Sequence, residues 1–466
     1  MLFSGIPFLF YFLLCTLALY FLAPKRAKNA VLLLMSLVFY AWGEPKFVVF
    51  MLVSIVQGWG FGLLVEKYRE NRARSKVFLT ASVVLSLGLL GYCKYADFFI
   101  TNFNAVTGLS LPLLKIALPI GISFYTFQIL SYVVDVYRGS VAAQRSFTAL
   151  GAYISFFPQL IAGPIVRYSD IERQLTERTH SIEDAALGAR RFVLGLSKKV
   201  LVANVLYELI TEFKGSEEKS LLFFWLYAIG YMLHIYFDFS GYSDMAIGLG
   251  RIFGFRFIEN FDYPYISKSV TEFWRRWHMS LGSWFRDYVY IPMGGNRVSR
   301  GRWIFNIFTV WMLTGLWHGA AWNFVLWGLL FAVLLAAEKF LAQPIQKLGG
   351  LYRIVTLLVL TVSFVLFDSA TLAEAAHSIG GLFGFGDYAL VTTESVYFLR
   401  SYAVVFLIAI VGATPLPKRI VSRIGESKGG ERLLNSFEPL VLFLLLAVCT
   451  AFLVDGSFNP FLYFRF

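Results

Sequence analysis

Residues 436–454 read SFEPLVLFLLLAVCTAFLV, and this stretch decides the fold class. It carries no charged side chain from Pro439 to Val454. A helix needs about 20 mostly apolar residues to cross the hydrocarbon core of a bilayer. The strands of a membrane barrel alternate apolar and polar residues instead. The continuous apolar run therefore predicts a membrane-spanning helix.

Similar runs recur along the whole chain. They lie near residues 6–23, 30–42, 47–65, 77–92, 117–136, 149–165, 192–210, 221–250, 303–317, 321–341, 351–368 and 397–413. The run at 149–165 contains Pro158 and the pair Gly163-Pro164, which favours a re-entrant or broken helix. Together the runs predict an all-α, polytopic integral membrane protein with about eleven to thirteen transmembrane or re-entrant helices.

The composition excludes the water-soluble alternatives. Of the 466 residues, 58% are hydrophobic and 15% are charged, and the mean hydropathy is +0.65. Soluble globular domains carry roughly 25% charged residues, because their exterior needs charge. A soluble enzyme and a disordered chain are therefore both excluded.

The positive charge is arranged in short loops between the apolar runs. The net charge is +12, and the basic residues cluster at 25–28 and in the loop 66–76. The positive-inside rule places both segments in the cytoplasm and the N-terminus outside, so the charge predicts contact with membrane lipids rather than with nucleic acid. The run 6–23 has no basic segment before it and no cleavage site after it, so we expect a retained first span.

The segments 166–200 and 251–302 mix charges with aromatic residues. Within them, TEFWRRWHMSLGSWFRDY at 271–288 has apolar residues at helical spacing, which predicts one amphipathic helix at the membrane interface. His278 falls on its apolar stripe. Two interpretations stay open: a general acid–base group, or a histidine that only caps an aromatic face.

His318 lies in the apolar stretch WMLTGLWHGAAWNF, residues 311–324. An ionisable group in such surroundings is costly and therefore marks a candidate functional site. Gly315 and Gly319, four residues apart, allow a close helix approach on one face. The alternative is a core histidine that forms one interhelical hydrogen bond. His180 and His377 are expected at the surface.

His234 and Asp238 are four residues apart on a predicted helix, so the carboxylate could orient the imidazole. The pair could also be half of a metal site, but no second pair accompanies it, and we predict no metal. The three cysteines are too far apart to suggest a disulfide or a zinc site. The chain has no P-loop, HExxH, GxSxG or GxGxxG motif, which argues against a bound nucleotide or redox cofactor.

Several long motifs resemble the membrane-bound O-acyltransferase family. They are FDYPY at 261–265, FWRRWHMSL at 273–281, WFRDYVYIPMGGN at 284–296 and LTGLWHG at 313–319, supported by PIGISF at 119–124, FPQLIAGPI at 157–165, FDFSGYSD at 237–244 and FLYFRF at 461–466. The chain is similar in particular to the bacterial branch of alginate O-acetylation membrane proteins. The same branch includes the membrane proteins of peptidoglycan O-acetylation and of D-alanyl transfer to teichoic acid.

The resemblance implies one membrane domain over residues 1–466, folded around a central tunnel. Its N-terminal helices would cover 1–110, its catalytic core 111–330 and its C-terminal helices 331–466.

The resemblance also implies that His318 is the catalytic histidine, which accepts the proton of the attacking hydroxyl. His278, at the second signature position, would place the acceptor or stabilise charge on the thioester oxygen. We expect supporting or substrate-binding roles for Trp274, Arg275, Arg276, Trp317, Asp238, His234 and Asn323. Arg275 and Arg276 would attract a phosphate-bearing donor, or simply contact lipid headgroups.

The resemblance further implies an enzyme of the bacterial cytoplasmic (inner) membrane. It would move an acyl group, above all acetyl, from a cytosolic thioester to hydroxyls of an extracytoplasmic polysaccharide such as alginate, directly or through a partner protein. The donor would be acetyl-coenzyme A or a phosphopantetheine carrier, with no permanently bound cofactor. Periplasmic or secreted acetyltransferases are the expected protein partners. Peptidoglycan acetylation, D-alanyl transfer, and an acyl transporter or scaffold without bond chemistry remain alternatives.

Overall fold

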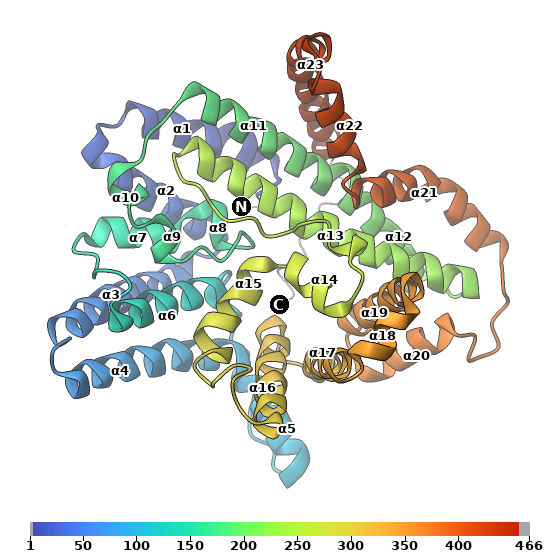
Figure 1. The fold of residues 1–466 in the computed structure, drawn as a ribbon, viewed down its shortest axis with the longest axis horizontal. Helices are drawn as coiled ribbons and strands as arrows, with labels where there is room; N and C mark the ends of the chain where they lie inside the picture. The colour runs from blue at the N-terminus through green and yellow to red at the C-terminus, as the bar shows by residue number, and fades with distance from the viewer. Residues whose placement is uncertain (1–2, 456–466) are drawn as a thin grey trace. The chain divides into compact units, whose positions relative to one another are not determined.

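A computed structural model describes residues 3–455, and every regular element in that range is helical (Figure 1). Seven helices within it are long and apolar enough to cross a membrane, which confirms the predicted class of all-α polytopic membrane protein. They span Pro45–Lys67, Arg72–Thr107, Leu221–Ile252, Trp322–Phe340, Gly350–Asp368, Thr393–Gly412 and Lys428–Val454. Several other predicted runs form shorter helices, such as α2 (Lys28–Gly43) and α6 (Ile122–Arg138).

Backbone contacts divide the chain into two compact units. The first contains residues 1–189 and 246–258, and the second contains residues 190–245 and 259–466. The predicted partition at residues 110 and 330 concerns function, and it stays a prediction.

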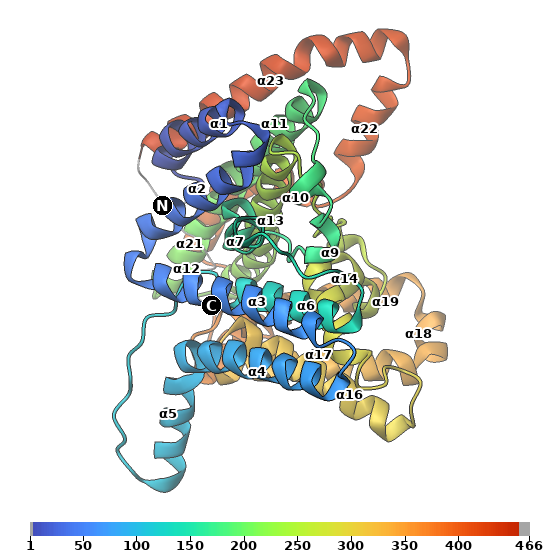
Figure 2. The same ribbon diagram turned by 90° about the vertical axis from the view of Figure 1, so that its left-hand side faces the viewer.

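The first unit is built from helices of the N-terminal third. These are η1 (Pro7–Phe12), α1 (Leu13–Leu22), α2, α3 (Val48–Lys67), α4 (Arg72–Leu90), η4 (Gly91–Tyr95), α5 (Ala96–Thr107), α6, α7 (Phe147–Ser155), α8 (Phe157–Leu160), α9 (Tyr168–Ile171) and α10 (Gln174–Glu177). α3 packs closely on α6, because a Cβ at Gly62 would lie 2.6 Å from the hydroxyl oxygen of Tyr132. The π-helical turn η4 interrupts the line of α4, and Figure 2 shows α5 leaving that line.

The run predicted to be re-entrant or broken is indeed broken. α7 ends at Ser155, and the four-residue helix α8 follows after Phe156. Pro158 lies in the first turn of α8, where its missing N–H leaves no hydrogen bond unformed. Residues 149–165 are buried throughout.

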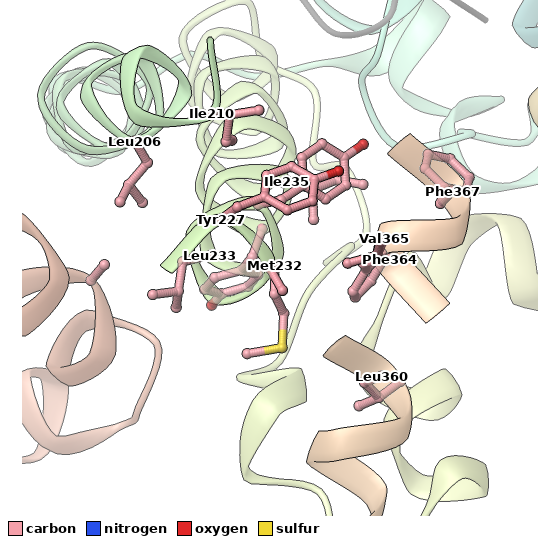
Figure 3. Close-up of a cluster of buried hydrophobic side chains, with 14 of the residues drawn as sticks. Leu206, Ile210, Tyr227, Met232, Leu233, Ile235, Leu360, Phe364, Val365 and Phe367 are labelled. Atoms are coloured by element: carbon pink, nitrogen blue, oxygen red, sulfur yellow. The ribbon is translucent and has the colours of Figure 1, made fainter. Parts of the chain in front are cut away.

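The second unit is organised around α13 (Leu221–Ile252), through Met245. The other elements of this unit are η5 (Lys198–Asn204), α12 (Val205–Gly215), η6 (Pro264–Ile266), α14 (Val270–Arg276), α15 (Met279–Phe285), η7 (Arg286–Tyr290), α16 (Arg300–His318), α17 (Trp322–Phe340), α18 (Ala342–Leu348), α19 (Gly350–Asp368), α20 (Leu372–Leu382), α21 (Thr393–Gly412), α22 (Leu416–Gly425) and α23 (Lys428–Val454). α11 (Ile182–Ser197) continues into this unit from residue 190. Apolar side chains from α12, α13 and α19 form the core seen in Figure 3.

Candidate functional site

His318 is the last residue of α16, and an aromatic cage surrounds its imidazole. The ring centroids of Trp317, Trp327 and Phe367 lie 4.9, 5.2 and 5.2 Å from that of His318, each ring edge-on to the imidazole. The residue is 7% exposed. The cage draws on α16, α17 and α19, so the position of His318 depends on how these three helices pack.

The close approach predicted at Gly315 is confirmed. α16 and α17 lie side by side (Figure 1), and a Cβ on Gly315 would lie 2.2 Å from the backbone oxygen of Phe324. A Cβ on Gly319 would collide with the ring of Phe324. Small residues on one helical face therefore bring the backbone of α17 next to His318.

His278 lies at a break between two short helices. α14 ends at Arg276, α15 begins at Met279, and His278 has a left-handed backbone with φ +45°. Its buried ring contacts Phe239 at 4.6 Å and Trp317 at 5.7 Å between centroids. Both imidazoles thus contact the indole of Trp317, although their residues are far apart in the sequence.

The prediction of one amphipathic helix over 271–288 is wrong. The segment contains α14, the break, α15 and the π-helical η7. At the break, backbone groups form tertiary hydrogen bonds instead of helical ones. The N–H of Asp262 donates to the carbonyl of Arg276 (2.9 Å), and the N–H of Met279 donates to the carbonyl of Asn260 (3.0 Å). His278 is therefore held by the segment 260–262 rather than by a continuous helical stripe.

Polar side chains surround one nitrogen of the His278 ring. Nδ1 lies 3.2 Å from Oδ1 of Asn260, which also accepts hydrogen bonds from the hydroxyl (2.8 Å) and the backbone N–H (3.3 Å) of Ser280. Nδ2 of Asn260 donates to the hydroxyl of Ser243 (3.0 Å). Nε2 of His278 is buried and has no hydrogen-bond partner among residues 3–455.

Burial holds the pKa of His278 well below its usual range, and the nearby charge of His318 acts in the same direction. The imidazole is therefore neutral at pH 7 and keeps a lone pair. The two buried imidazoles lie around one indole, and that of His278 is neutral with an Nε2 that is unpaired within residues 3–455. Such a pair can accept and return a proton in a site that excludes water.

The tryptophan and arginine candidates on α14 have different surroundings. Trp274 packs edge-on against Trp311, Trp327 and Phe331, and thus supports one wall of the His318 cage. Arg276 pairs with Asp262 (2.7 Å) and Glu272 (3.0 Å). Arg275 is exposed and has no ion-pair partner within the described range. Of the two arginines, Arg275 is the one whose guanidinium can meet an anionic ligand or headgroup.

The hypothesis that Asp238 orients His234 is wrong. The carboxylate of Asp238 pairs with the ammonium of Lys199 at 2.5 Å, and both side chains are buried. Nδ1 of His234 instead donates to the backbone carbonyl of Ala203 (2.8 Å). These two residues stabilise the packing of α13 against η5, and Phe239, next to Asp238, contacts His278.

Asn323 acts at a distance from the imidazoles. Its Nδ2 donates to the backbone carbonyl of Ser369 (2.9 Å), which ties the start of α17 to the end of α19. This bond helps to keep Phe367 and Trp327 against His318. His180 and His377 are exposed, as predicted.

Four residues around His278 were not predicted from the sequence, namely Asn260, Ser243, Ser280 and Phe239. Ser243 and Phe239 belong to the motif FDFSGYSD, and Asn260 directly precedes FDYPY. The long motifs thus contained the signal, because a polar residue beside an apolar motif is a candidate for a buried hydrogen bond.

Comparisons with known proteins show which family this chain resembles. Residues 140–367 match the family model described as MBOAT, membrane-bound O-acyltransferase family. The chain is 38% identical to Probable alginate O-acetylase AlgI of Azotobacter vinelandii over 501 aligned residues, which cover both chains fully. It is 32% identical to the Peptidoglycan O-acetyltransferase of Helicobacter pylori, with 100% of this chain and 98% of that protein covered. It is 31% identical to the Teichoic acid D-alanyltransferase of Bacillus subtilis, with 53% of this chain and 67% of that protein covered.

The matched segment contains both imidazoles, the indole between them and the polar residues around His278. Full-length identity to an O-acetylase extends the likeness to the helices outside that segment. The chain therefore belongs to the membrane-bound O-acyltransferase family.

Proposed function

We propose that this multi-pass membrane enzyme transfers an acetyl group from a cytosolic thioester to hydroxyls of an extracytoplasmic, alginate-like polysaccharide, in the bacterial cytoplasmic (inner) membrane. The observation that carries the proposal is the buried imidazole pair of His278 and His318 around Trp317. The similarity to alginate O-acetylase over the whole chain supports the acetyl group and the acceptor. The shorter match to the D-alanyltransferase gives weaker support to D-alanyl transfer.

In the second unit, the charges at the helix ends indicate which side faces the cytosol, and so the side from which a cytosolic donor would enter. Basic residues gather at one set of ends, namely Arg297, Arg300 and Arg302 around the start of α16, Lys339, Lys347 and Arg353 from the end of α17 to the start of α19, and Lys418, Arg419 and Arg423 in α22. The opposite ends carry Glu217, Glu218, Asp368, Glu374, Asp387 and Glu394 with Lys214 and Lys219. The positive-inside rule assigns the first set to the cytosol.

This assignment also orients the candidate site. α16 begins at the basic Arg300 and ends at His318, so His318 belongs to the extracytoplasmic half of its helix. In the proposal, the polysaccharide hydroxyl approaches from that half and the thioester from the basic half. The central tunnel that would join the two stays a prediction.

The proposed reaction balances without a cofactor. The hydroxyl oxygen attacks the carbonyl carbon of the thioester, a C–O bond forms and the C–S bond breaks. An imidazole accepts the hydroxyl proton and returns it to the leaving thiolate. The products are the acetyl ester and the free thiol of coenzyme A or of a phosphopantetheine carrier. Transfer through a hydroxyl of a periplasmic or secreted acetyltransferase follows the same balance.

The test uses the full-length protein in sealed proteoliposomes, with a labelled acetyl thioester on the side that the basic helix ends face and an alginate oligosaccharide on the other. His318→Ala and His278→Ala should each lower ester formation and thiol release by about a hundredfold or more. His377→Ala, which changes an exposed histidine, is the matched control. A correctly inserted His318→Ala protein with normal ester formation would contradict the proposal, and label crossing the bilayer with no thiol release would favour a transporter. Peptidoglycan fragments and teichoic acid serve as competing acceptors.

A further inference from the structure

We propose that Asn260 is a positioning residue that holds His278 in the tautomer with its proton on Nδ1, so that Nε2 carries the lone pair that accepts a hydrogen bond from the acceptor hydroxyl. This role rests on the proposed function for its chemistry. Proton acceptance stays with His318, as the family resemblance implies, and His278 places the acceptor hydroxyl.

The hydrogen bonds of Asn260 fix the orientation of its own amide. The backbone N–H of Ser280 can only donate, and it lies 3.3 Å from the atom assigned as Oδ1. The opposite atom, Nδ2, lies 3.0 Å from the hydroxyl of Ser243. Exchange of the two atoms would place an NH₂ group against the N–H of Ser280. The oxygen of Asn260 therefore faces His278.

This orientation decides the tautomer. An amide oxygen has no proton to donate, so the contact of 3.2 Å with His278 is a hydrogen bond only if Nδ1 carries the proton. In a neutral imidazole the lone pair then lies on Nε2. Nε2 is buried without a partner among the described residues. A buried acceptor without a donor is costly, and a substrate hydroxyl would supply the missing donor.

The backbone holds Asn260 and His278 in place from both sides. The carbonyl of Asn260 accepts from Met279 N (3.0 Å), directly after the left-handed residue His278. A left-handed histidine is an uncommon conformation that tertiary contacts must stabilise. The strain indicates that the fold specifies the direction of this ring.

Ion pairs hold Asp244 and Glu259, the residues that follow Ser243 and precede Asn260 in the chain. Arg191 pairs with Asp244 (2.9 Å) and Glu259 (2.5 Å), which are the chain neighbours of Ser243 and Asn260. Lys198 also pairs with Asp244 (2.6 Å). These pairs fix α13 against the segment that carries Asn260, so the amide keeps its direction when a substrate enters.

Within residues 3–455, one titratable neighbour acts on His278. On α16 this is His318, on α13 the ring contact is the apolar Phe239, and on α15 the neighbour is the hydroxyl of Ser280. On the segment 259–262, Glu259 and Asp262 are paired with arginines. A carboxylate at position 260 would thus be a new charge beside the ring.

The experiment measures the tautomer and the chemistry separately. Full-length protein with ¹⁵N-labelled histidine is studied in lipid by solid-state NMR, and the signal of His278 is assigned by its loss in His278→Gln. Wild-type protein should show a protonated Nδ1 and an unprotonated Nε2. Asn260→Leu should lose this signature and lower kcat at least tenfold, with KM for the donor within twofold. Asn306→Leu, which removes another buried asparagine of the same unit, should keep the signature.

Asn260→Asp supplies the conservative variant. A carboxylate still accepts from Nδ1 but stabilises the imidazolium. It should preserve the tautomer and restore kcat above pH 8, and it should move the acid limb of the pH–rate profile upward by at least one unit. The inference is overturned if Asn260→Leu keeps the tautomer, or if Asn260→Asp leaves the acid limb in place. A changed tautomer in Asn260→Leu together with full activity in His278→Gln would support the positioning by Asn260 and overturn the proposed role of His278.

Discussion

Gly315 of α16 and Gly328 of α17 face each other across the contact between the two helices. A Cβ built on Gly328 would lie 3.2 Å from the Cα of Gly315 and 2.2 Å from the backbone oxygen of Trp311. Neither position can hold a methyl group unless the helices separate. Since His318 ends α16 and Trp327 belongs to its cage, this contact sets the geometry of the candidate site.

Gly328→Ala should therefore damage both folding and activity. Overpacking of this kind costs about 1–3 kcal/mol, and the helix separation should move Trp327 away from His318. We expect a lower unfolding temperature and ester formation reduced by about tenfold or more. Gly301→Ala is the control, because a Cβ at Gly301 would meet no atom within 4 Å. Equal stability of the two variants would show that the crossing is not tight.

Trp317 is expected to act through the two imidazoles that contact it. Replacement by leucine removes the indole at 5.7 Å from the ring of His278 and at 4.9 Å from that of His318. Both rings would gain freedom, and a misplacement of about 1 Å can lower a rate by a hundredfold. We expect kcat to fall by about tenfold to a hundredfold, measured by thiol release. Trp322→Leu, on an exposed position, should have little effect, and similar kcat values for the two variants would contradict the role of Trp317.

The position of His318 could be predicted from the sequence, whereas the surroundings of His278 could not. Apolar flanks and the glycines at 315 and 319 are local signals, and they correctly predict a buried histidine beside a close helix contact. The break at His278 depends on hydrogen bonds from the segment 260–262, which no periodicity reveals. The partner of Asp238 was missed for the same reason. Spacing along α13 pointed to His234, but the charge of Lys199 from η5 lies closer to the carboxylate.

The pH dependence of stability should report the buried state of His278. Its pKa in the folded protein lies well below the usual value of about 6.5 because of burial and the charge of His318. Below about pH 6.5 the unfolded chain binds a proton at this residue and the folded chain does not, so stability is lost as the pH falls. The loss attributable to His278 is at most about 1.4 kcal/mol per pH unit.

Thermal unfolding between pH 8 and pH 5 measures this effect. His278→Gln should show a smaller decline toward acid pH than wild type, and His377→Gln should follow wild type. If His278→Gln instead declined more steeply toward acid pH than wild type, the folded state would stabilise the imidazolium, which is the opposite of the effect expected from burial.

The buried pair of Lys199 and Asp238 should be strongly coupled. Both side chains are about 2% exposed, and their charged atoms lie 2.5 Å apart. Lys199→Met leaves an uncompensated carboxylate in the core of the second unit, and loss of one partner of a buried pair costs about 3–5 kcal/mol. The double variant Lys199→Met/Asp238→Leu removes both charges and should recover most of that loss. The surface pair of Arg286 and Asp287 gives the reference, since Arg286→Met should change stability by less than about 1 kcal/mol. The free energies of unfolding of wild type, of the single variants Lys199→Met and Asp238→Leu and of the double variant measure the coupling. Additive losses in the double variant would show that Asp238 is stabilised by groups other than Lys199.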